Sequence, residues 1–312
     1  MSSTGKREVD KDDIKVPHTP HDIKCKARRT LLSQKLRAQR KKAKEGARKE
    51  RQMERQKLGD AAPAVQKPRT IESMRRQDET VVDENDQEYQ DEIEIDEFAE
   101  YFQGREPKVV LTTNTNPAGC AIVFAKMFEK ILPQAEYCSR RHFELKDIVK
   151  FATNREYTDI MVVNEDRGKI NSLMICHLPN GPTALFKVSS ITMPDKIPGG
   201  GEMTSHKAEL IVNNFTTRLG HTVGRMFAAL FPQDPNFKGR RVCTLHNQRD
   251  YIFFRQHRYM FESREKAALH ELGPRFTLKL ISLQHGTFDT SSGEYIHLHK
   301  AGMDVDRKKF VL

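Results

Sequence analysis

The chain has 312 residues and a formal net charge of +10, with 31% charged and 37% hydrophobic residues. No apolar run approaches the ~20 residues that cross a bilayer, and the first residues lack the apolar centre of a signal peptide. The five cysteines include no C-x-x-C pair, which argues against a disulfide framework or a cysteine zinc site. We therefore expect an intracellular chain with reduced thiols, no membrane partner and, because of its basic surplus, a polyanionic partner.

Residues 1–104 form a charged N-terminal extension with two opposite blocks. Residues 24–57 hold fifteen Lys or Arg against three Glu, whereas residues 78–100 hold twelve Asp or Glu and no Lys or Arg. Blocks of like charge bury little apolar surface, so we expect the extension to be largely disordered or helical. The basic block is rich in good helix formers. It is either a targeting segment that contacts RNA phosphates or simply a solvated helix, and the acidic block is a candidate shield for it.

Residues 105–190 alternate short apolar runs with turn sequences. Helices are predicted from Pro117 onwards, with apolar residues at helical spacing, and over the shorter range 143–151. Four strands are predicted, at residues 108–112, 160–163, 173–177 and 184–188.

The range 205–288 repeats this scheme. A helix is predicted over 219–231, where Pro232 ends it. Strands are predicted at residues 208–212, 242–245, 251–261 and 276–283.

Two ordered matches indicate that the chain contains an internal duplication. The pattern K-M-F followed by I-L-P, from Lys126, matches R-M-F followed by L-F-P, from Arg225. The pattern G-P-x4-K from Gly181 recurs from Gly273. We therefore predict a domain over 105–288 made of two related α+β halves, about 105–190 and 205–288, with a C-terminal extension over 289–312.

Several longer motifs then point to one family. They are G-R-E-P-K from Gly104, L-P-N-G-P-T from Leu178, N-F-T-T-R-L-G-H from Asn214, H-N-Q-R-D-Y-I-F-F-R from His246 and E-L-G-P-R-F-T-L-K-L from Glu271. In this order they resemble the Brix-domain family of ribosome-biogenesis proteins, from Gly104 to the C-terminus. The resemblance implies a duplicated Brix domain in which each half is similar to the anticodon-binding domain of class II aminoacyl-tRNA synthetases.

The same resemblance implies a function. It predicts a non-enzymatic assembly factor of the nucleus and nucleolus that binds precursor ribosomal RNA and supports rRNA processing and maturation of the large (60S) subunit. Its expected partners are that RNA and the other assembly factors and ribosomal proteins of pre-60S particles. No cofactor and no small-molecule substrate are implied. The alternative is a protein-docking scaffold with little direct RNA contact, whose basic surface meets acidic partners.

By position, the family's RNA-binding segment maps to residues 267–284. The candidate residues in it are Glu271, Gly273, Pro274, Arg275, Thr277, Lys279, Ser282 and Gln284. Because side chains alternate along a strand, Arg275, Thr277 and Lys279 share one face, while the apolar residues between them face the core. That basic row suits phosphate contacts, and an ordinary half-exposed strand explains the pattern about as well.

Further candidates for RNA contact lie elsewhere in the second half. Arg218, His221 and Arg225 surround the start of the predicted helix, where free N–H groups favour a phosphate. Arg249, Arg255 and Arg258 lie within or beside an aromatic strand, where unpaired bases stack on exposed rings, although most of these rings are expected in the core.

An enzyme or metal protein is the rival class. The sequence contains no G-x-x-x-x-G-K-[ST], no G-x-S-x-G and no H-E-x-x-H. His297 and His299 share a face of a predicted strand, but no third ligand is near them in the sequence. We therefore expect no catalytic residue and no metal site.

Overall fold

The computed structural model describes residues 23–59, 68–70, 72–76, 78–82, 87, 90–91, 96–234, 237–264, 266–288, 293–305 and 308–312. The chain divides into one unit that ends at Pro68 and a second that runs from Arg69 to Leu312. The described residues of the first unit include helix α1 (Lys26–Leu58) of 33 residues, which confirms that the basic block is helical. No described helix is long and apolar enough to span a membrane.

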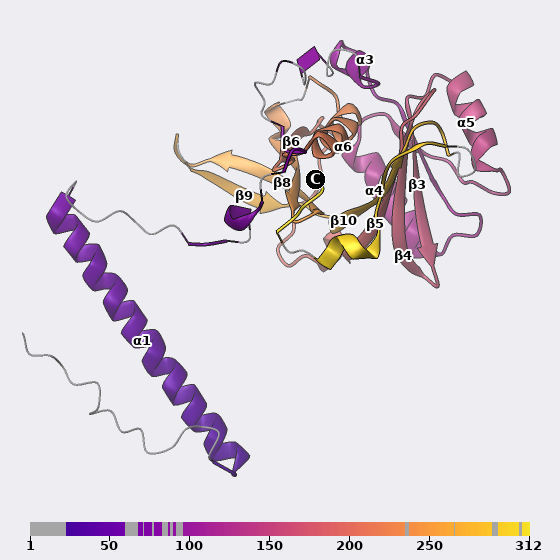
Figure 1. Ribbon diagram of the computed structural model, residues 1–312. Coiled ribbons are helices and arrows are strands. Elements are labelled where there is room, and N and C mark those ends of the chain that lie inside the picture. Colours follow the sequence, from indigo (N-terminus) through magenta and orange to yellow (C-terminus); the bar gives the residue numbers. More distant parts are fainter. Residues whose placement is uncertain are drawn as a thin grey trace, which may run out of the picture. The chain divides into compact units, whose positions relative to one another are not determined.

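The second unit is a sheet with a few helices (Figure 1), and both halves follow the predicted order. The first half consists of β1 (Val109–Thr113), α4 (Gly119–Ile131), β2 (Ala135–Tyr137), α5 (Leu145–Asn154), β3 (Asp159–Asp166), β4 (Lys169–His177) and β5 (Thr183–Thr192). The second consists of β6 (Glu209–Asn213), α6 (Arg218–Ala229), β7 (Arg241–Gln248), β8 (Tyr251–Phe261), β9 (Ala267–Glu271), β10 (Arg275–Gln284) and β11 (Tyr295–Leu298). Short helical turns are α3 (Ala99–Phe102), η3 (Glu72–Met74), η4 (Pro194–Lys196), η5 (Phe237–Gly239) and η6 (Ala301–Val305).

The halves share one topology and join into a single sheet of eleven strands. The strand order is β2-β1-β3-β4-β5-β10-β8-β7-β6, with β11 on β10 and β9 on β8. In the first half β1 pairs in parallel with β3, and the pairs β3–β4 and β4–β5 are antiparallel. In the second half β6 pairs in parallel with β7, and the pairs β7–β8 and β8–β10 are antiparallel. Strands β5 and β10 meet antiparallel at the centre, where the repeat lysines Lys187 and Lys279 lie opposite each other. This arrangement agrees with the duplication expected from the sequence.

The two halves share one large core. Helices α4 and α6 pack against the same face of the sheet, and apolar side chains of the central strands β5, β10 and β8 complete this core. Helix α5 covers the opposite face over the first half only, where Val110, Ile160 and Val162 form a second, smaller core. The second half has no counterpart of α5 among the described residues. The face that α5 covers in the first half is therefore open in the second.

The folded unit begins earlier than the boundary at residue 105 that we expected. The backbone N–H of Val82 donates to the carbonyl of Thr216, and the carboxylate of Asp96 pairs with the guanidinium of Arg225. The described parts of the acidic block thus contact the second half. Residues 83–86, 88–89 and 92–95 of that block lie outside the described residues, and the expected shielding of the basic block stays a prediction.

Helix α3 anchors the extension on the first half by covering a buried pair. The side chains of Asp159 and His177 pair where neither is exposed to solvent. The rings of Phe98 and Tyr101 meet that of His177 edge-on, with centroids 4.9 and 5.6 Å away. Burial raises the pKa of Tyr101, whose neutral hydroxyl donates to the carbonyl of Thr158 at 3.1 Å. The end of the N-terminal extension is therefore packed against the first half.

Candidate nucleic-acid interface

The open side of the second-half sheet presents basic and aromatic side chains together. Directly opposite residues of paired strands point to the same face, and the pairings place Lys279 with Lys187 and Tyr251, and Arg255 with Thr244. We call this surface the open face; its residues are Lys187, Ser189, Thr244, His246, Tyr251, Phe253, Arg255, His257, Arg275, Thr277 and Lys279. All of them except Thr277 are at least partly exposed.

Arg275 is held in place by an ion pair within the protein. Its Nε and Nη2 each donate to a carboxylate oxygen of Glu271 at 2.8 Å. The guanidinium stays partly exposed, with a side-chain exposure of 37%. The preceding Gly273 has φ +67°, and a Cβ there would meet Ile197 at 2.6 Å, so glycine is needed at this turn. Gly273 and Pro274 are themselves buried and serve to aim the strand.

We expected Arg275, Thr277 and Lys279 to form an exposed row, but the side chains of Thr277 and Lys279 are largely buried. Thr277 is only 6% exposed, because it lies between Phe253 and Ser189 on the neighbouring strands. The ammonium of Lys279 donates to both carboxylate oxygens of Asp304 at 2.8 Å, and its side chain is 13% exposed. The C-terminal extension therefore covers this end of the row.

Arg255 lies at the centre of the open face beside an aromatic ring. Its guanidinium is 5.8 Å from the ring centroid of Phe253, and Nη1 donates to the carbonyl of Phe254 at 2.7 Å. Partial burial lowers the pKa of this guanidinium. A positive charge held beside a ring offers both a phosphate contact and a stacking surface.

We expected a phosphate at the start of α6, but groups of the protein lie there instead. The hydroxyl of Thr217 accepts from the N–H of Gly220 at 2.9 Å and caps the helix. A Cβ on Gly220 would meet backbone atoms of Leu312, so the last residues of the sequence pack against this end. Arg225 pairs with Asp96. Arg218, His221 and Arg225 all have partners within the chain.

The remaining candidates are dispersed. Arg249 is exposed in the turn between β7 and β8. Arg258 points to the other side of the sheet, where Nη2 donates to the carbonyl of Glu202 at 3.4 Å. Ser282 is partly exposed and Gln284 is buried, both at the far end of β10. Arg258 therefore does not share a surface with Arg255 and Arg275, whereas Ser282, which lies opposite Leu185, is on the sheet face of Lys187 near its far end.

Lys187 belongs to the open face but was missing from the candidates. It is exposed at the centre of the sheet, and no carboxylate of the described residues pairs with it. The repeat already contained the signal, because Lys187 is the counterpart of Lys279 in the G-P-x4-K pattern. His246 was also missing, while Tyr251 and Phe253 were considered only as rings of the aromatic strand; the pairing of β8 with β7 and β10 places all three on the open face.

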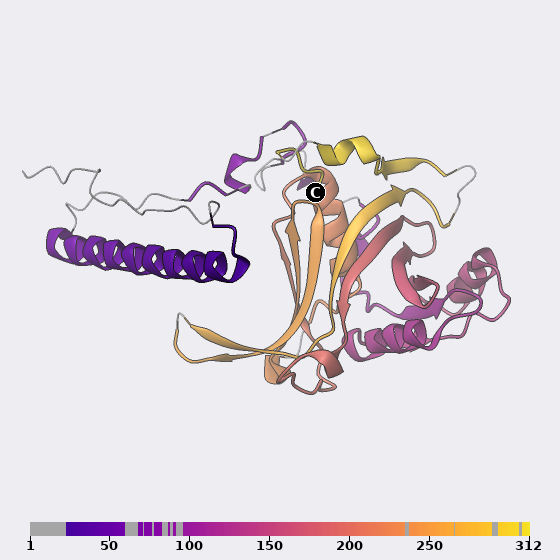
Figure 2. The same cartoon turned by 90° about the horizontal axis from the view of Figure 1, so that it is seen from below.

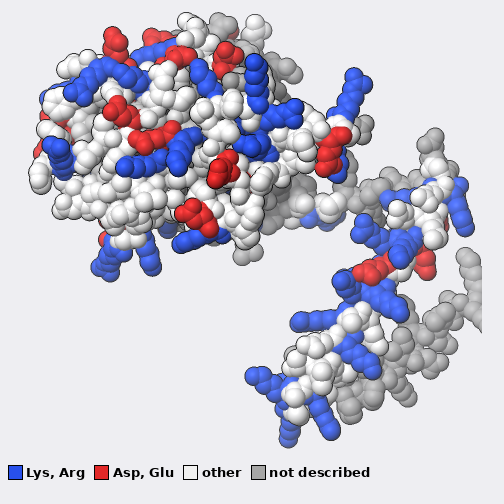
Figure 3. All heavy atoms as spheres, turned by 180° about the vertical axis from the view of Figure 1, so that it is seen from behind, with Lys and Arg blue, Asp and Glu red and all other residues white. Residues whose placement is uncertain are grey.

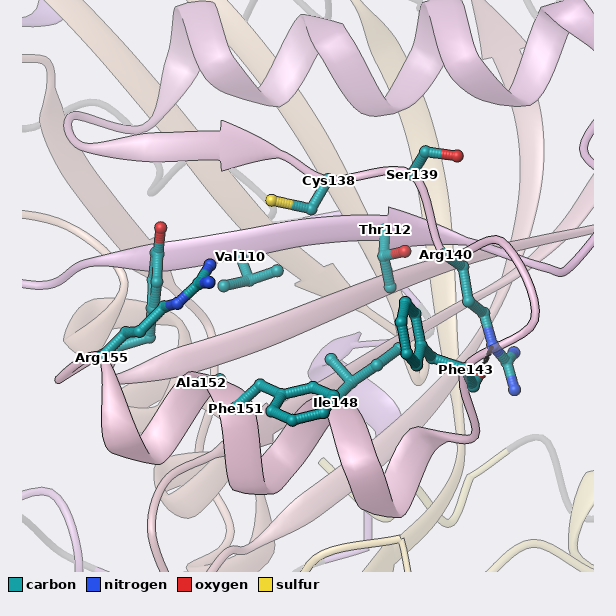
Figure 4. A pocket seen from close by; sticks show the side chains of 11 residues that line it. Val110, Thr112, Cys138, Ser139, Arg140, Phe143, Ile148, Phe151, Ala152 and Arg155 are labelled. Carbon is teal, nitrogen blue, oxygen red and sulfur yellow. Dashed lines mark hydrogen bonds between the residues drawn. The ribbon is translucent and has the colours of Figure 1, made fainter.

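A separate cavity of about 340 Å³ lies beneath α5 in the first half (Figure 4). Val110 on β1 and Ile148 and Phe151 on α5 line it, with Cys138 and Arg140 from the segment after β2. Burial, the larger cause, and the charge of Glu136 raise the pKa of the Cys138 thiol. Because the thiolate is the nucleophilic form, this environment suits an apolar side chain better than covalent catalysis.

Comparison with known proteins identifies relatives over most of the chain. The Brix domain matches residues 121–282. Ribosome production factor 1 of Mus musculus is 49% identical over 294 residues, which cover 93% of this chain and 84% of the relative. Ribosome production factor 1 of Saccharomyces cerevisiae is 47% identical over 247 residues, 78% of this chain and 80% of the relative. The crystal structure of a probable ribosomal biogenesis protein from Aeropyrum pernix K1 covers 62% of this chain and 99% of its own, with a TM-score of 0.42 at 15% identity.

Proposed function

Since the chain belongs to the Brix-domain family of ribosome-biogenesis factors, we propose that it binds precursor ribosomal RNA through the open face of its second half. The observation that carries this proposal is the uncovered sheet surface on which Lys187, Arg255 and Arg275 lie beside Tyr251 and Phe253. Lys and Arg contact phosphates, while exposed rings and guanidinium planes stack on unpaired bases. The proposal includes that each half is similar to the anticodon-binding domains of class II aminoacyl-tRNA synthetases; the common topology of the halves supports their duplication.

The proposal extends to the cellular role. The chain acts in the nucleus and nucleolus, in processing of precursor rRNA and maturation of the large ribosomal subunit, with assembly factors and ribosomal proteins of pre-60S particles as neighbours. The relatives' name, ribosome production factor 1, supports this role. Its contribution is binding and positioning of RNA rather than catalysis.

Substitution of Lys187, Arg255 and Arg275 by glutamine in the full chain is expected to weaken binding to precursor rRNA by about tenfold or more. The plot of log affinity against log salt is expected to become shallower by roughly two to three units, since each of the three phosphate contacts contributes a little under one. The measurement is a salt series with purified protein and a precursor rRNA fragment.

The control of equal charge is Lys146→Gln, Lys150→Gln and Lys169→Gln, three exposed lysines of the first half that lie outside the open face. We expect it to change affinity less than about threefold. Equal losses in the two variants would show that RNA responds to net charge alone and would refute an interface on the open face.

The two-stranded ribbon of β8 and β9, residues 257–271, favours a protein-docking role for this part of the chain. This ribbon leaves the body of the sheet (Figure 2), and Met260, Phe261 and Leu269 on it are 56%, 68% and 62% exposed. Residues 257–271 contain three Lys or Arg and three Glu, so the ribbon has no net charge within a basic protein. A surface with no net charge and with exposed apolar side chains fits an apolar segment of a neighbouring assembly factor or ribosomal protein better than RNA.

Phe261→Ser with Leu269→Ser is expected to reduce the recovery of partner proteins with the tagged full chain several-fold, while its RNA affinity and unfolding midpoint stay unchanged. Quantitative mass spectrometry of purified pre-ribosomal particles measures the recovery. Ile296→Ser with Leu298→Ser in β11 removes two similarly exposed apolar side chains and serves as control. Unaltered partner recovery in the ribbon variant would exclude docking there.

A further inference from the structure

The basic helix α1 distributes its charge unevenly around its axis. Residues 26–58 contain fourteen Lys or Arg and three Glu. In an α-helix of 3.6 residues per turn, residues three, four or seven apart share a face. One face therefore collects nine cations, which are Lys26, Arg29, Arg37, Arg40, Lys41, Lys44, Arg48, Arg51 and Arg55. We call it the arginine face, and all nine residues are exposed.

The opposite side carries a thinner row of a different composition. Its five cations are Arg28, Lys35, Lys42, Lys49 and Lys57. Six of the nine residues on the arginine face are arginine, against one of five in this lysine row. The guanidinium presents a planar fork that binds a phosphate with two hydrogen bonds, whereas an ammonium acts as a point charge. Arginine is thus concentrated on one side of the helix.

The dimensions of the arginine face fit a polyphosphate. Residues 26 to 55 span about 43 Å along the axis at ~1.5 Å per residue. Neighbouring cations three or four residues apart are separated by roughly 4.5 to 6 Å along it, the same order as successive phosphates of a nucleic-acid strand. The glutamates Glu45, Glu50 and Glu54 fall outside this arc of the helix. Figure 3 shows Lys and Arg side chains along α1, with few acidic ones among them.

We infer that α1 binds the phosphate backbone of structured RNA through its arginine face, as a contact additional to the open face. This inference rests on the proposed function, because it takes RNA as the partner of the chain. The helix supplies a row of nine exposed cations on one face, six of them guanidinium groups. Binding of this kind is set by backbone shape rather than base sequence.

Two variants of the full chain with equal loss of charge test the inference. The first carries Arg37→Gln, Arg40→Gln, Arg48→Gln and Arg51→Gln, and the second Lys35→Gln, Lys42→Gln, Lys49→Gln and Lys57→Gln. Glutamine is a good helix former, so circular dichroism should show the helix retained in both. Against a duplex RNA of about two turns, we expect the arginine-face variant to bind at least about tenfold more weakly and the lysine-row variant less than about threefold.

Three results separate the possibilities. Equal losses in the two variants would overturn the inference, because net charge would then explain binding. Unchanged duplex binding together with lost binding of polyglutamate in the arginine-face variant would also overturn it, in favour of an acidic protein partner. Replacing the same four arginines by lysine keeps the charge and removes the guanidinium forks, so we expect a loss of duplex affinity between those of the wild type and the glutamine variant. The Lys187, Arg255 and Arg275 variant, measured in parallel on precursor rRNA, shows whether the open-face proposal stands independently.

Discussion

Replacing Phe276 with alanine is expected to lower the free energy of unfolding by about 4 kcal/mol, because the lost ring leaves a cavity in the shared core. Phe276 is 1% exposed and stacks on Phe254 with ring centroids 4.5 Å apart. Its edges also contact Phe124 and Phe128 of α4, at 5.4 and 5.9 Å. The ring therefore links the helix of the first half to the strands of the second.

Urea unfolding of the full chain measures this loss, and Phe253→Ala is the matched control. Phe253 lies on the adjacent strand but faces the open side, where it is only partly buried. We expect its truncation to lower the free energy of unfolding by less than about 1.5 kcal/mol. Similar losses for the two phenylalanines would contradict the assignment of the covered and open faces.

Arg241→Met is expected to lower the free energy of unfolding by about 3 kcal/mol, because it leaves buried carbonyls without donors. Arg241 is 2% exposed. Its guanidinium donates to the carbonyls of Thr204, His206 at 2.9 Å and Lys130 at 2.8 Å. One side chain thus connects the end of α4 to the segment that joins the two halves, and methionine retains most of its volume.

The neighbouring residue provides the control for this prediction. Arg240 is exposed, so Arg240→Met should change the free energy of unfolding by less than about 0.5 kcal/mol. Differential scanning calorimetry of both variants measures the difference. If Arg241→Met were as mild as Arg240→Met, the buried guanidinium would not hold the halves together.

Much of the fold could be predicted because its signals are local and periodic. The predicted helices and strands of both halves are present, since apolar residues repeat at two or 3.6 positions along them. The short strands β2 and β9 were not predicted, whereas the strand expected around His297 and His299 is present as β11. The docking of the acidic extension depends on contacts between distant residues, such as Asp96 with Arg225, which no local pattern contains.

The candidate site could be predicted in part. Alternation along β10 correctly separates Arg275 and Lys279 from the core residues between them. Alternation alone does not show that α5 covers only the first half, or that Asp304 lies over Lys279. Those features arise from tertiary packing. Because of them, the candidate RNA contact is Lys187 rather than its repeat counterpart Lys279.

Crosslinking of the full chain to precursor rRNA by ultraviolet light, followed by mass spectrometry of the crosslinked peptides, tests the central claim most directly. We expect crosslinks at Tyr251 and Phe253 of β8, and in the peptides that contain Lys187 and Arg275, with a further set in α1. Crosslinks confined to the outer surface of α5, or to other parts of the first half away from β5, would contradict an RNA interface on the open face.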